Sequence, residues 1–128
     1  MSLLDVKIYY EDTDCGGVVY YANYLRYFER ARTEYFVERG LSLRDYMQQG
    51  IVFVVARAEV SYEASAYYGD ILTIDSQIDQ VKKVSFVFNH IVHRKGEDTV
   101  LVRSAVKLGC VNGAGKPTRI PSTIIAAL

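Results

Sequence analysis

Two aspartates and two glycines lie close together near the amino end of the chain, in the stretch EDTDCGGVVYYAN. Asp12 and Asp14 come first, Gly16 and Gly17 follow, and a helix-like pattern begins at Asn23. The first backbone N–H groups of a helix have no intrahelical acceptor, and the helix dipole makes this end positive. A carboxylate held beside such groups places a nucleophile or base next to donors that can polarise a carbonyl oxygen. The arrangement therefore indicates acyl-transfer chemistry.

The same residues allow three other interpretations. Asp12, Asp14 and Gly17 fit positions 1, 3 and 6 of an EF-hand, but that loop needs an oxygen ligand and a glutamate at positions 5 and 12. This chain has Gly16 and Asn23 there. A phosphoryl-transfer site with paired aspartates would want a hydroxyl residue two positions on, a longer chain and a parallel α/β pattern, and the sequence supplies none of these. The third interpretation is that the aspartates only cap a turn, and the residues alone leave it open beside acyl transfer.

A strand and a long helix must position this acidic turn. Residues 3–10 are rich in Val, Ile and Tyr and indicate a strand that runs into the turn. From Asn23 to about Arg39, large apolar residues recur at helical spacing, with Asn23 as the expected N-cap and Gly40 as the expected stop. The apolar face expected from this spacing is Tyr24, Leu25, Phe28, Ala31, Tyr35 and Phe36.

The rest of the chain is mostly strand-like. Ser42 and Asp45 indicate a short second helix through Gln49. Four β-branched segments follow at residues 51–67, 71–81, 84–94 and 99–111, separated by short polar turns. Strands after one long helix predict an α+β domain, with a curved antiparallel sheet laid against that helix. One helix leaves part of the sheet without cover, so we expect self-association.

Bulk properties narrow the class of protein. The 128 residues are half apolar, which suits one domain over residues 1–128. Fifteen basic and fifteen acidic residues cancel, so no global field favours nucleic acid or an anionic membrane. Two cysteines are too few for a disulfide scaffold and are compatible with a reducing cytosol. No apolar run approaches the length of a membrane span, and we expect a cytoplasmic protein.

Four motifs in the first third of the chain resemble a known active-site signature. They are YEDTD at residues 10–14, GVVY at 17–20, ANYL at 22–25 and ERARTE at 29–34. Together they resemble the 4-hydroxybenzoyl-CoA thioesterase family of hotdog-fold proteins, and most of all its acyl-CoA thioesterases associated with the bacterial tol-pal cluster. The similarity continues more loosely through AYYGD at 66–70 and VSFVF at 84–88. It implies a hotdog fold, a long central helix wrapped by a curved antiparallel sheet, whose dimers join their sheets and often pair into tetramers.

The resemblance also implies roles for particular residues. Asp14 is implied as the catalytic carboxylate, either a nucleophile on the thioester carbonyl or a base for water. The backbone N–H at or near Tyr21 is implied as the donor that polarises the thioester oxygen. The tol-pal relatives commonly have histidine where this chain has Tyr21, and the benzoyl-CoA enzymes can have tyrosine. Gly17, Tyr20 and Tyr24 are candidates for contact with the substrate.

Other candidate groups are less specific. Lys82 and Lys83 either bind the phosphates of coenzyme A, as basic residues near this point do in the family, or form a solvated turn. Arg57 and Arg94 are weaker candidates for the same role. Cys15 follows Asp14 and is an alternative nucleophile, although no histidine lies nearby in the sequence.

His90 and His93 are three apart on an expected strand, so they point to opposite faces and do not make a metal pair.

The prediction is an acyl-CoA thioesterase that hydrolyses an acyl or aroyl thioester to the free acid and coenzyme A, without a metal or redox cofactor. Its active sites are expected at subunit interfaces of a homodimer or homotetramer. The alternatives are a thioesterase acting on acyl carrier protein, and a non-catalytic hotdog protein that binds acyl-CoA or acyl carrier protein. A hotdog dehydratase is disfavoured, because those enzymes use a histidine in the helix region and this chain has none before His90.

Overall fold

The computed structural model describes all residues from 1 to 128. Five strands and three α-helices make up most of the chain, and one turn of 3₁₀ helix, η1, covers the start of the acidic turn. The elements in chain order are β1 (Ser2–Lys7), η1 (Tyr10–Asp12), α1 (Asn23–Glu38), α2 (Leu43–Gln48), β2 (Val52–Tyr62), β3 (Ile71–Asp79), β4 (Ser85–Arg94), β5 (Val100–Val111) and α3 (Ser122–Ala127).

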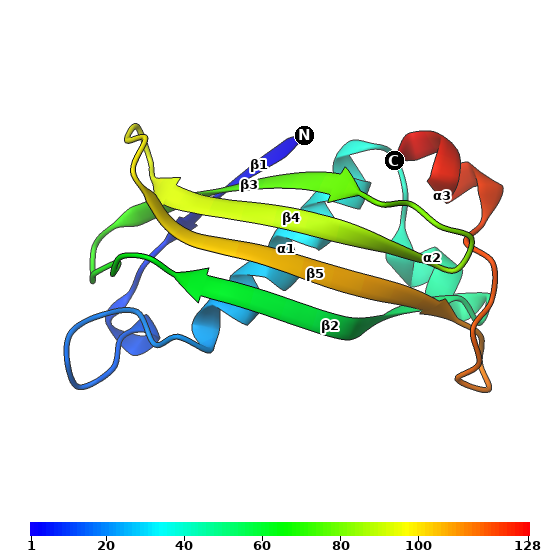
Figure 1. Cartoon of the computed structure of the whole chain (residues 1–128), viewed down its shortest axis with the longest axis horizontal. Helices are drawn as coiled ribbons and strands as arrows, with labels where there is room; N and C mark the ends of the chain where they lie inside the picture. Colours follow the sequence, from blue (N-terminus) through cyan, green and yellow to red (C-terminus); the bar gives the residue numbers. More distant parts are fainter.

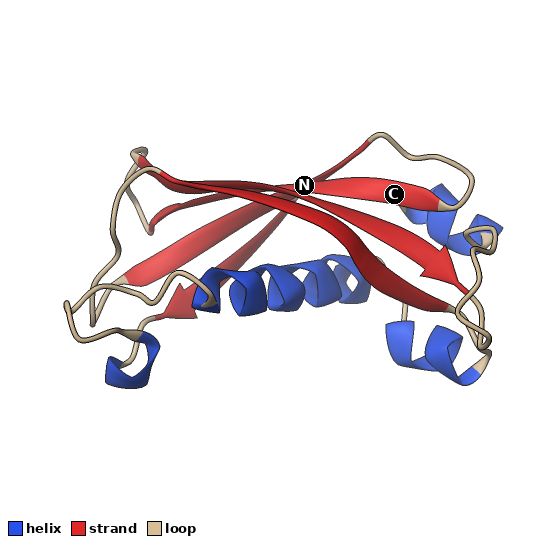
Figure 2. Ribbon diagram, turned by 60° about the horizontal axis from the view of Figure 1, so that its bottom comes forward, coloured by secondary structure: helices blue, strands red, loops and turns tan.

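The strands form one antiparallel sheet in the order β1-β3-β4-β5-β2 (Figure 1). The sheet is curved, and α1 lies across one of its faces (Figure 2). The β2–β5 register shifts between Val55 and Arg57, which marks a bulge in the edge strand. Bulges of this kind bend a strand and increase its twist. The expected α+β architecture with a curved antiparallel sheet around a long helix is confirmed.

The core between α1 and the sheet consists of two apolar clusters. Phe28 belongs to the cluster nearer the acidic turn, and Phe36 belongs to the other. Between them, the buried His90 ring stacks on Phe28 with ring centres 4.7 Å apart. His90 Nδ1 makes a 2.7 Å hydrogen bond with the Ser76 hydroxyl, and Ser104 lies opposite His90 on β5. A row of polar side chains therefore crosses the middle of an otherwise apolar core.

The predicted helix is confirmed, but two details of its face were wrong. Gly40 follows the end of α1 with φ of +73°, as expected of a helix stop. Leu25, expected on the apolar face, is 45% exposed, whereas Tyr27 is buried. The sheet covers the side of α1 that carries Tyr24, Tyr27 and Ala31, and Leu25 lies outside that contact.

Two strands end earlier than expected by three residues or more, and one helix was not expected. The first strand ends at Lys7, because the chain turns into η1 at Tyr10 and the Asp12 carboxylate accepts a 2.8 Å bond from the Tyr9 N–H. β2 ends at Tyr62 rather than at residue 67. The short helix α3 was not expected. It packs Ile124 into the Phe36 cluster.

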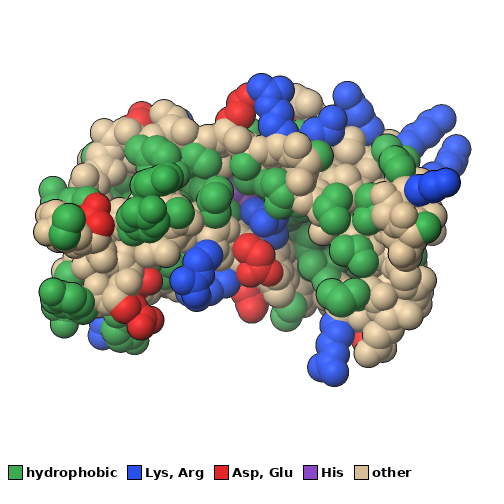
Figure 3. Space-filling view, turned by 90° about the horizontal axis from the view of Figure 1, so that it is seen from below, with side chains coloured by type: hydrophobic (Ala, Val, Ile, Leu, Met, Phe, Trp, Pro, Cys, Tyr) green, Lys and Arg blue, Asp and Glu red, His purple; other side chains and the backbone are tan.

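One long edge of the sheet has no cover from this chain. β2 pairs only with β5, and most of its side chains are exposed, including Val54 and Val55. Figure 3, which faces this edge, shows hydrophobic side chains and charges of both signs exposed between the sheet and the helix. None of the helices is both long and apolar enough to cross a membrane.

Candidate active site

The acidic turn is closed by its own backbone. The Asp14 N–H donates to the Val18 carbonyl over 2.9 Å, and the Gly17 N–H donates to the Asp14 carbonyl over 3.1 Å. Gly17 has φ of +81°, a conformation that costs a residue with a Cβ about 1–2 kcal/mol. The backbone of the turn thus fixes where the Asp14 side chain leaves the chain.

One oxygen of the Asp14 carboxylate is held and the other is free. The Gly16 N–H donates to Oδ1 over 2.8 Å, whereas Oδ2 accepts no hydrogen bond from any group of the chain. A Cβ on Gly16 would lie 3.1 Å from Oδ1, so the glycine allows this close approach. The Asp14 residue is exposed. The turn therefore presents one oriented, unoccupied carboxylate oxygen to solvent.

Two N–H donors lie unpaired just before α1. The N–H groups of Tyr21 and Ala22 donate to no group of the chain, whereas the next one, on Asn23, donates to the Tyr20 carbonyl over 2.9 Å. These are the orphan donors of a helix start, at the positive end of the helix dipole. Such donors can stabilise the oxyanion that forms when a carbonyl is attacked.

A single backbone oxygen connects the turn with the helix. The Asp12 carbonyl accepts from the Tyr20 N–H over 2.9 Å and from the Asn23 side-chain amide over 2.8 Å. The expectation that Asn23 caps the helix was wrong, because Ala22 holds the cap position and Asn23 is the first helical residue. Its side chain reaches back to the turn instead. The carboxylate of Asp14 and the free N–H groups are therefore positioned by one shared contact.

A cleft of about 310 Å³ opens beside Asp14, and tyrosine rings form much of its wall. Tyr62 at the end of β2 meets Tyr21 edge to face, with ring centres 6.1 Å apart, and its ring lies 5.8 Å from that of Tyr24. Burial is the main cause that raises the pKa of Tyr24 to about 12. The lining residues are Asp14, Val18, Val19, Tyr21, Tyr24, Tyr62, Glu63, Ala64 and Ser65.

The structure brings some of the predicted site residues together and leaves others apart. Asp14, Tyr21 and Tyr24 line the same cleft. Gly17 shapes the turn without lining the cleft, and Tyr20 lies beside it, partly exposed, with its ring 4.8 Å from that of Tyr21. The pKa of Tyr20 is raised, chiefly by the interaction of its phenol with the Tyr21 phenol.

The predicted phosphate ligands lie elsewhere in the same chain. Lys82 and Lys83 lie in the β3–β4 connection, at the opposite end of the sheet from the acidic turn (Figure 1). Lys82 lines a separate cavity of about 270 Å³ with Arg57 and Lys107. Within one chain, this basic cavity and the Asp14 cleft are therefore two distinct places.

The other candidates are placed as follows. Arg94 pairs with Asp70, its Nε 2.9 Å from Oδ2. Cys15 is an exposed free thiol that does not line the cleft. Cys110 is buried, and its burial raises the pKa of its thiol.

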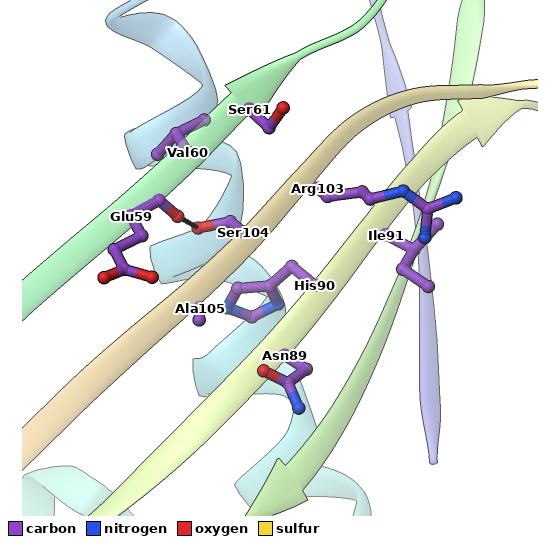
Figure 4. A pocket seen from close by; sticks show the side chains of 9 residues that line it. All are labelled: Glu59, Val60, Ser61, Asn89, His90, Ile91, Arg103, Ser104 and Ala105. Atoms are coloured by element: carbon purple, nitrogen blue, oxygen red, sulfur yellow. Dashed lines mark hydrogen bonds between the residues drawn. The ribbon is translucent and has the colours of Figure 1, made fainter.

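A shallow cavity of about 490 Å³ lies over the middle of β2, β4 and β5 (Figure 4). Its lining joins charged, amide and hydroxyl side chains, and unlike the Asp14 cleft it lies over the sheet and away from the start of α1. His90 is buried in this part of the sheet, and burial is the main cause that lowers its pKa to about 3, which keeps the ring neutral.

Sequence reasoning did not find the segment from Tyr62 to Ser65, which forms one wall of the cleft. These residues carry no catalytic motif. They reach the site because the β2–β5 pairing brings the end of β2 beside the start of α1.

The chain is similar in sequence to a known protein superfamily and to several known proteins. A model of the thioesterase-like superfamily matches residues 9–128. An acyl-CoA thioesterase YbgC from Haemophilus influenzae is 37% identical over 124 residues, which are 95% of this chain and 90% of that protein. An acyl-CoA thioester hydrolase YbgC from Escherichia coli is 38% identical over 122 residues, which are 94% of this chain and 90% of that protein.

A solved structure supports the fold. A 4-hydroxybenzoyl-CoA thioesterase variant in complex with 4-hydroxybenzoyl-CoA superposes with a TM-score of 0.90 at 27% identity, over 98% of this chain and 96% of that one. The hotdog fold expected from the sequence is confirmed by this similarity.

Proposed function

The chain belongs to the thioesterase-like superfamily, and on that basis we propose that it is an acyl-CoA thioesterase in which Asp14 is the essential carboxylate. The observation that carries the proposal is the free Oδ2 of Asp14 in a cleft that Tyr21 also lines, at a helix start where the N–H groups of Tyr21 and Ala22 are unpaired. The names of the relatives, which are acyl-CoA thioester hydrolases, support the substrate class.

The proposed reaction uses the carboxylate of Asp14 and the unpaired N–H groups at the start of α1. The thioester oxygen accepts from the N–H groups of Tyr21 and Ala22, which stabilise the charge that develops on it. Removing one such donor typically costs about 3 kcal/mol of barrier. The Asp14 Oδ2 then either attacks the carbonyl carbon or takes a proton from a water that attacks it. In the first route the carbon–sulfur bond breaks to leave an anhydride between the acyl group and Asp14, and a water then hydrolyses this anhydride and regenerates the carboxylate. In the second route the oxygen of the water replaces the sulfur directly. In both routes coenzyme A leaves as a thiolate that takes up a proton from the water, and the acyl group ends as the acid.

The test is release of free thiol from a panel of acyl-CoAs, from short to long chains and including benzoyl and hydroxybenzoyl. The wild type is compared with Asp14→Asn, which keeps the size and most of the shape of the side chain. We expect turnover on some of these substrates and a loss of about three orders of magnitude or more in the variant. Asp98→Asn, at an exposed aspartate in the β4–β5 turn, is the matched control and should be unaffected.

Two results would contradict this assignment. Hydrolysis by Asp14→Asn at the wild-type rate would remove Asp14 from the mechanism. Binding of acyl-CoA without hydrolysis would indicate a non-catalytic acyl-binding protein. Running the same panel on acyl carrier protein thioesters distinguishes the carrier-protein thioesterase, which would favour those substrates. A blank without substrate corrects for the exposed thiol of Cys15.

A homo-oligomer is the second part of the proposal, with a second copy pairing along β2. This strand offers 11 residues of unpaired backbone on one side, and Val54 and Val55 are exposed beside it. Exposed edges of this kind are ready to pair with another strand. The partly buried Arg32 of α1 has no ion-pair partner within the chain. A carboxylate of the second copy would give Arg32 an ion-pair partner.

Antiparallel pairing of two copies would also allow Lys82 and Lys83 to bind the phosphates of coenzyme A. β2 begins at the end of the sheet that carries these lysines and ends at the cleft (Figure 1). Pairing about the middle of β2 therefore brings the lysine end of one copy toward the cleft of the other, where the phosphates of coenzyme A would lie. Light scattering tests the oligomer, and Lys82→Ala with Lys83→Ala should raise the KM for acyl-CoA several-fold while leaving kcat unchanged.

The compartment is the last part of the proposal. The exposed free thiol of Cys15 is compatible with a reducing environment. A cytoplasmic protein is therefore part of the proposal.

A further inference from the structure

We propose that Tyr62 is a positioning residue for the thioesterase reaction, because its hydroxyl fixes the peptide group that carries the Ala22 N–H, one of the two unpaired donors proposed to bind the thioester oxygen. The inference rests on the proposed function and concerns the same site. Tyr62 is the last residue of β2 and lies 41 residues after Tyr21 in the sequence. It belongs to none of the motifs that identify the acidic turn.

The contact is a hydrogen bond from a side chain to a backbone oxygen. The Tyr62 hydroxyl donates to the Tyr21 carbonyl over 3.0 Å. The other donor to this oxygen is the Tyr24 N–H, at 3.4 Å, which is long for a helical bond. The Tyr21 carbonyl and the Ala22 N–H belong to the same peptide plane. Whatever fixes this carbonyl therefore also fixes the direction of the free Ala22 N–H.

The neighbouring peptide is held in a different way. The carbonyl of Tyr20, which shares a plane with the free N–H of Tyr21, accepts from the Asn23 N–H over 2.9 Å. That bond is made within the helix start itself. The Tyr21 carbonyl has no comparably short bond from the helix and receives its short bond from β2 instead. Of the two unpaired donors at the helix start, the Ala22 N–H is thus the one whose peptide is held by a distant side chain.

The Tyr62 hydroxyl affects the strength of the Ala22 N–H as a hydrogen-bond donor as well as its direction. Hydrogen bonds in a chain polarise one another, so a donor on the Tyr21 carbonyl makes the Ala22 N–H a better donor. Burial, followed by the neighbouring Tyr21 phenol, raises the pKa of Tyr62, so its hydroxyl keeps its proton well above neutral pH. The edge-to-face contact with Tyr21 and the contact with Tyr24 hold the ring in place.

Tyr62→Phe tests the inference because it removes the hydroxyl and keeps the ring. We expect kcat to fall about fivefold to tenfold, as for the loss of one hydrogen bond, with KM unchanged within twofold. The loss should be similar for every acyl group that the enzyme accepts, because the contact is to the backbone and not to the acyl chain. The Ala22 amide proton should also move upfield in the NMR spectrum, since its peptide is less polarised.

Tyr46→Phe is the matched control. The Tyr46 hydroxyl also makes a hydrogen bond, with Thr123 Oγ1 at the far end of the molecule, and its loss should leave kcat and the Ala22 amide unchanged. The oligomeric state is measured for both variants, because Tyr62 ends the edge strand.

The outcomes separate this inference from the proposed function. If Asp14→Asn is inactive but Tyr62→Phe keeps the wild-type kcat and Ala22 shift, Tyr62 has no positioning role and the thioesterase assignment stands. A rise in KM at constant kcat overturns the inference as well, because it would make Tyr62 a substrate contact. Failure of the wild type to hydrolyse any thioester overturns both.

Discussion

The side-chain amide of Asn23 donates a 2.8 Å hydrogen bond to the backbone carbonyl of Asp12, so the first residue of the long helix holds the turn that carries Asp14, the carboxylate proposed as catalytic. The Tyr20 N–H reaches the same oxygen over 2.9 Å. Asp14 lies two residues beyond Asp12, and the free N–H of Tyr21 follows Tyr20 directly. The distance between carboxylate and donors therefore depends on this contact.

Asn23→Ala should harm catalysis more than stability. The loss of one partly buried hydrogen bond is expected to lower the free energy of unfolding by about 1 kcal/mol. A turn that shifts by about 1 Å against the helix start can lower the rate by up to about a hundredfold, and we expect a fall in kcat/KM of at least tenfold. Urea unfolding and thiol release measure the two effects.

Asn112→Ala is the comparison for this variant. The Asn112 Oδ1 accepts from the N–H groups of Ala114 and Lys116 over 3.0 and 3.1 Å, in the turn after β5 and outside the cleft. It should lose a similar amount of stability and keep its kcat/KM. Equal losses of activity in the two variants would mean that the Asn23 effect is general instability.

Gly16→Ala should displace the Asp14 carboxylate. A Cβ at this position would lie 3.1 Å from Oδ1, closer than ordinary contacts allow, while the N–H that holds Oδ1 is kept. We expect kcat to fall about tenfold with little change in thermal unfolding, because the turn is exposed and has room to adjust. Gly113→Ala, where a Cβ meets nothing within 4 Å, is the control and should behave as wild type.

The helices α1 and α2 and the acidic turn could be predicted from the sequence, since local patterns determine them. The three-and-four spacing that includes Phe28, Ala31 and Phe36 marks α1, and these residues are buried. Gly40 and Ser42 mark the end of α1 and the start of α2, where the Ser42 hydroxyl accepts from the Asp45 N–H. The acidic turn was also predictable, because the carboxylates, glycines and helix start that build it are neighbours in sequence.

The remaining parts of the site depend on contacts between distant segments. Tyr62 reaches the helix start only through the pairing of β2 with β5, which no local pattern specifies. Asn23 has the residue type of a helix cap, but its amide bonds to the turn 11 residues earlier. Leu25 fits the apolar period and is exposed, because the sheet covers only one side of α1. In each case tertiary contact overrides a local preference.

Arg94→Lys should weaken the wall of the cleft. The Arg94 guanidinium bonds to Asp70 Oδ2 over 2.9 Å and to the Ser65 carbonyl over 2.7 Å, and Ser65 lines the cleft. Lysine keeps the charge and loses the two-pronged geometry.

For Arg94→Lys we expect a several-fold rise in KM and a fall of about 1 kcal/mol in the free energy of unfolding. Arg103→Lys alters a more exposed pair with Glu63 and should change stability by less than about 0.5 kcal/mol. A KM equal to that of the wild type would show that Ser65 is held by other contacts.

His90 should make the fold sensitive to acid. Burial first, and the nearby Arg32 second, lower its pKa from 6.5 to about 3, so the folded protein keeps the ring neutral while the unfolded chain protonates it. The unfolded state then binds more protons below pH 6.5, and stability falls as the pH drops from there toward 3. Between pH 7 and 5 this one group should lower the free energy of unfolding by about 2 kcal/mol.

His90→Gln keeps a polar group beside Ser76 and leaves every other titrating group unchanged. Its free energy of unfolding, measured in urea at the two pH values, should fall by correspondingly less. The same pH dependence in both proteins would mean that His90 is not the group responsible.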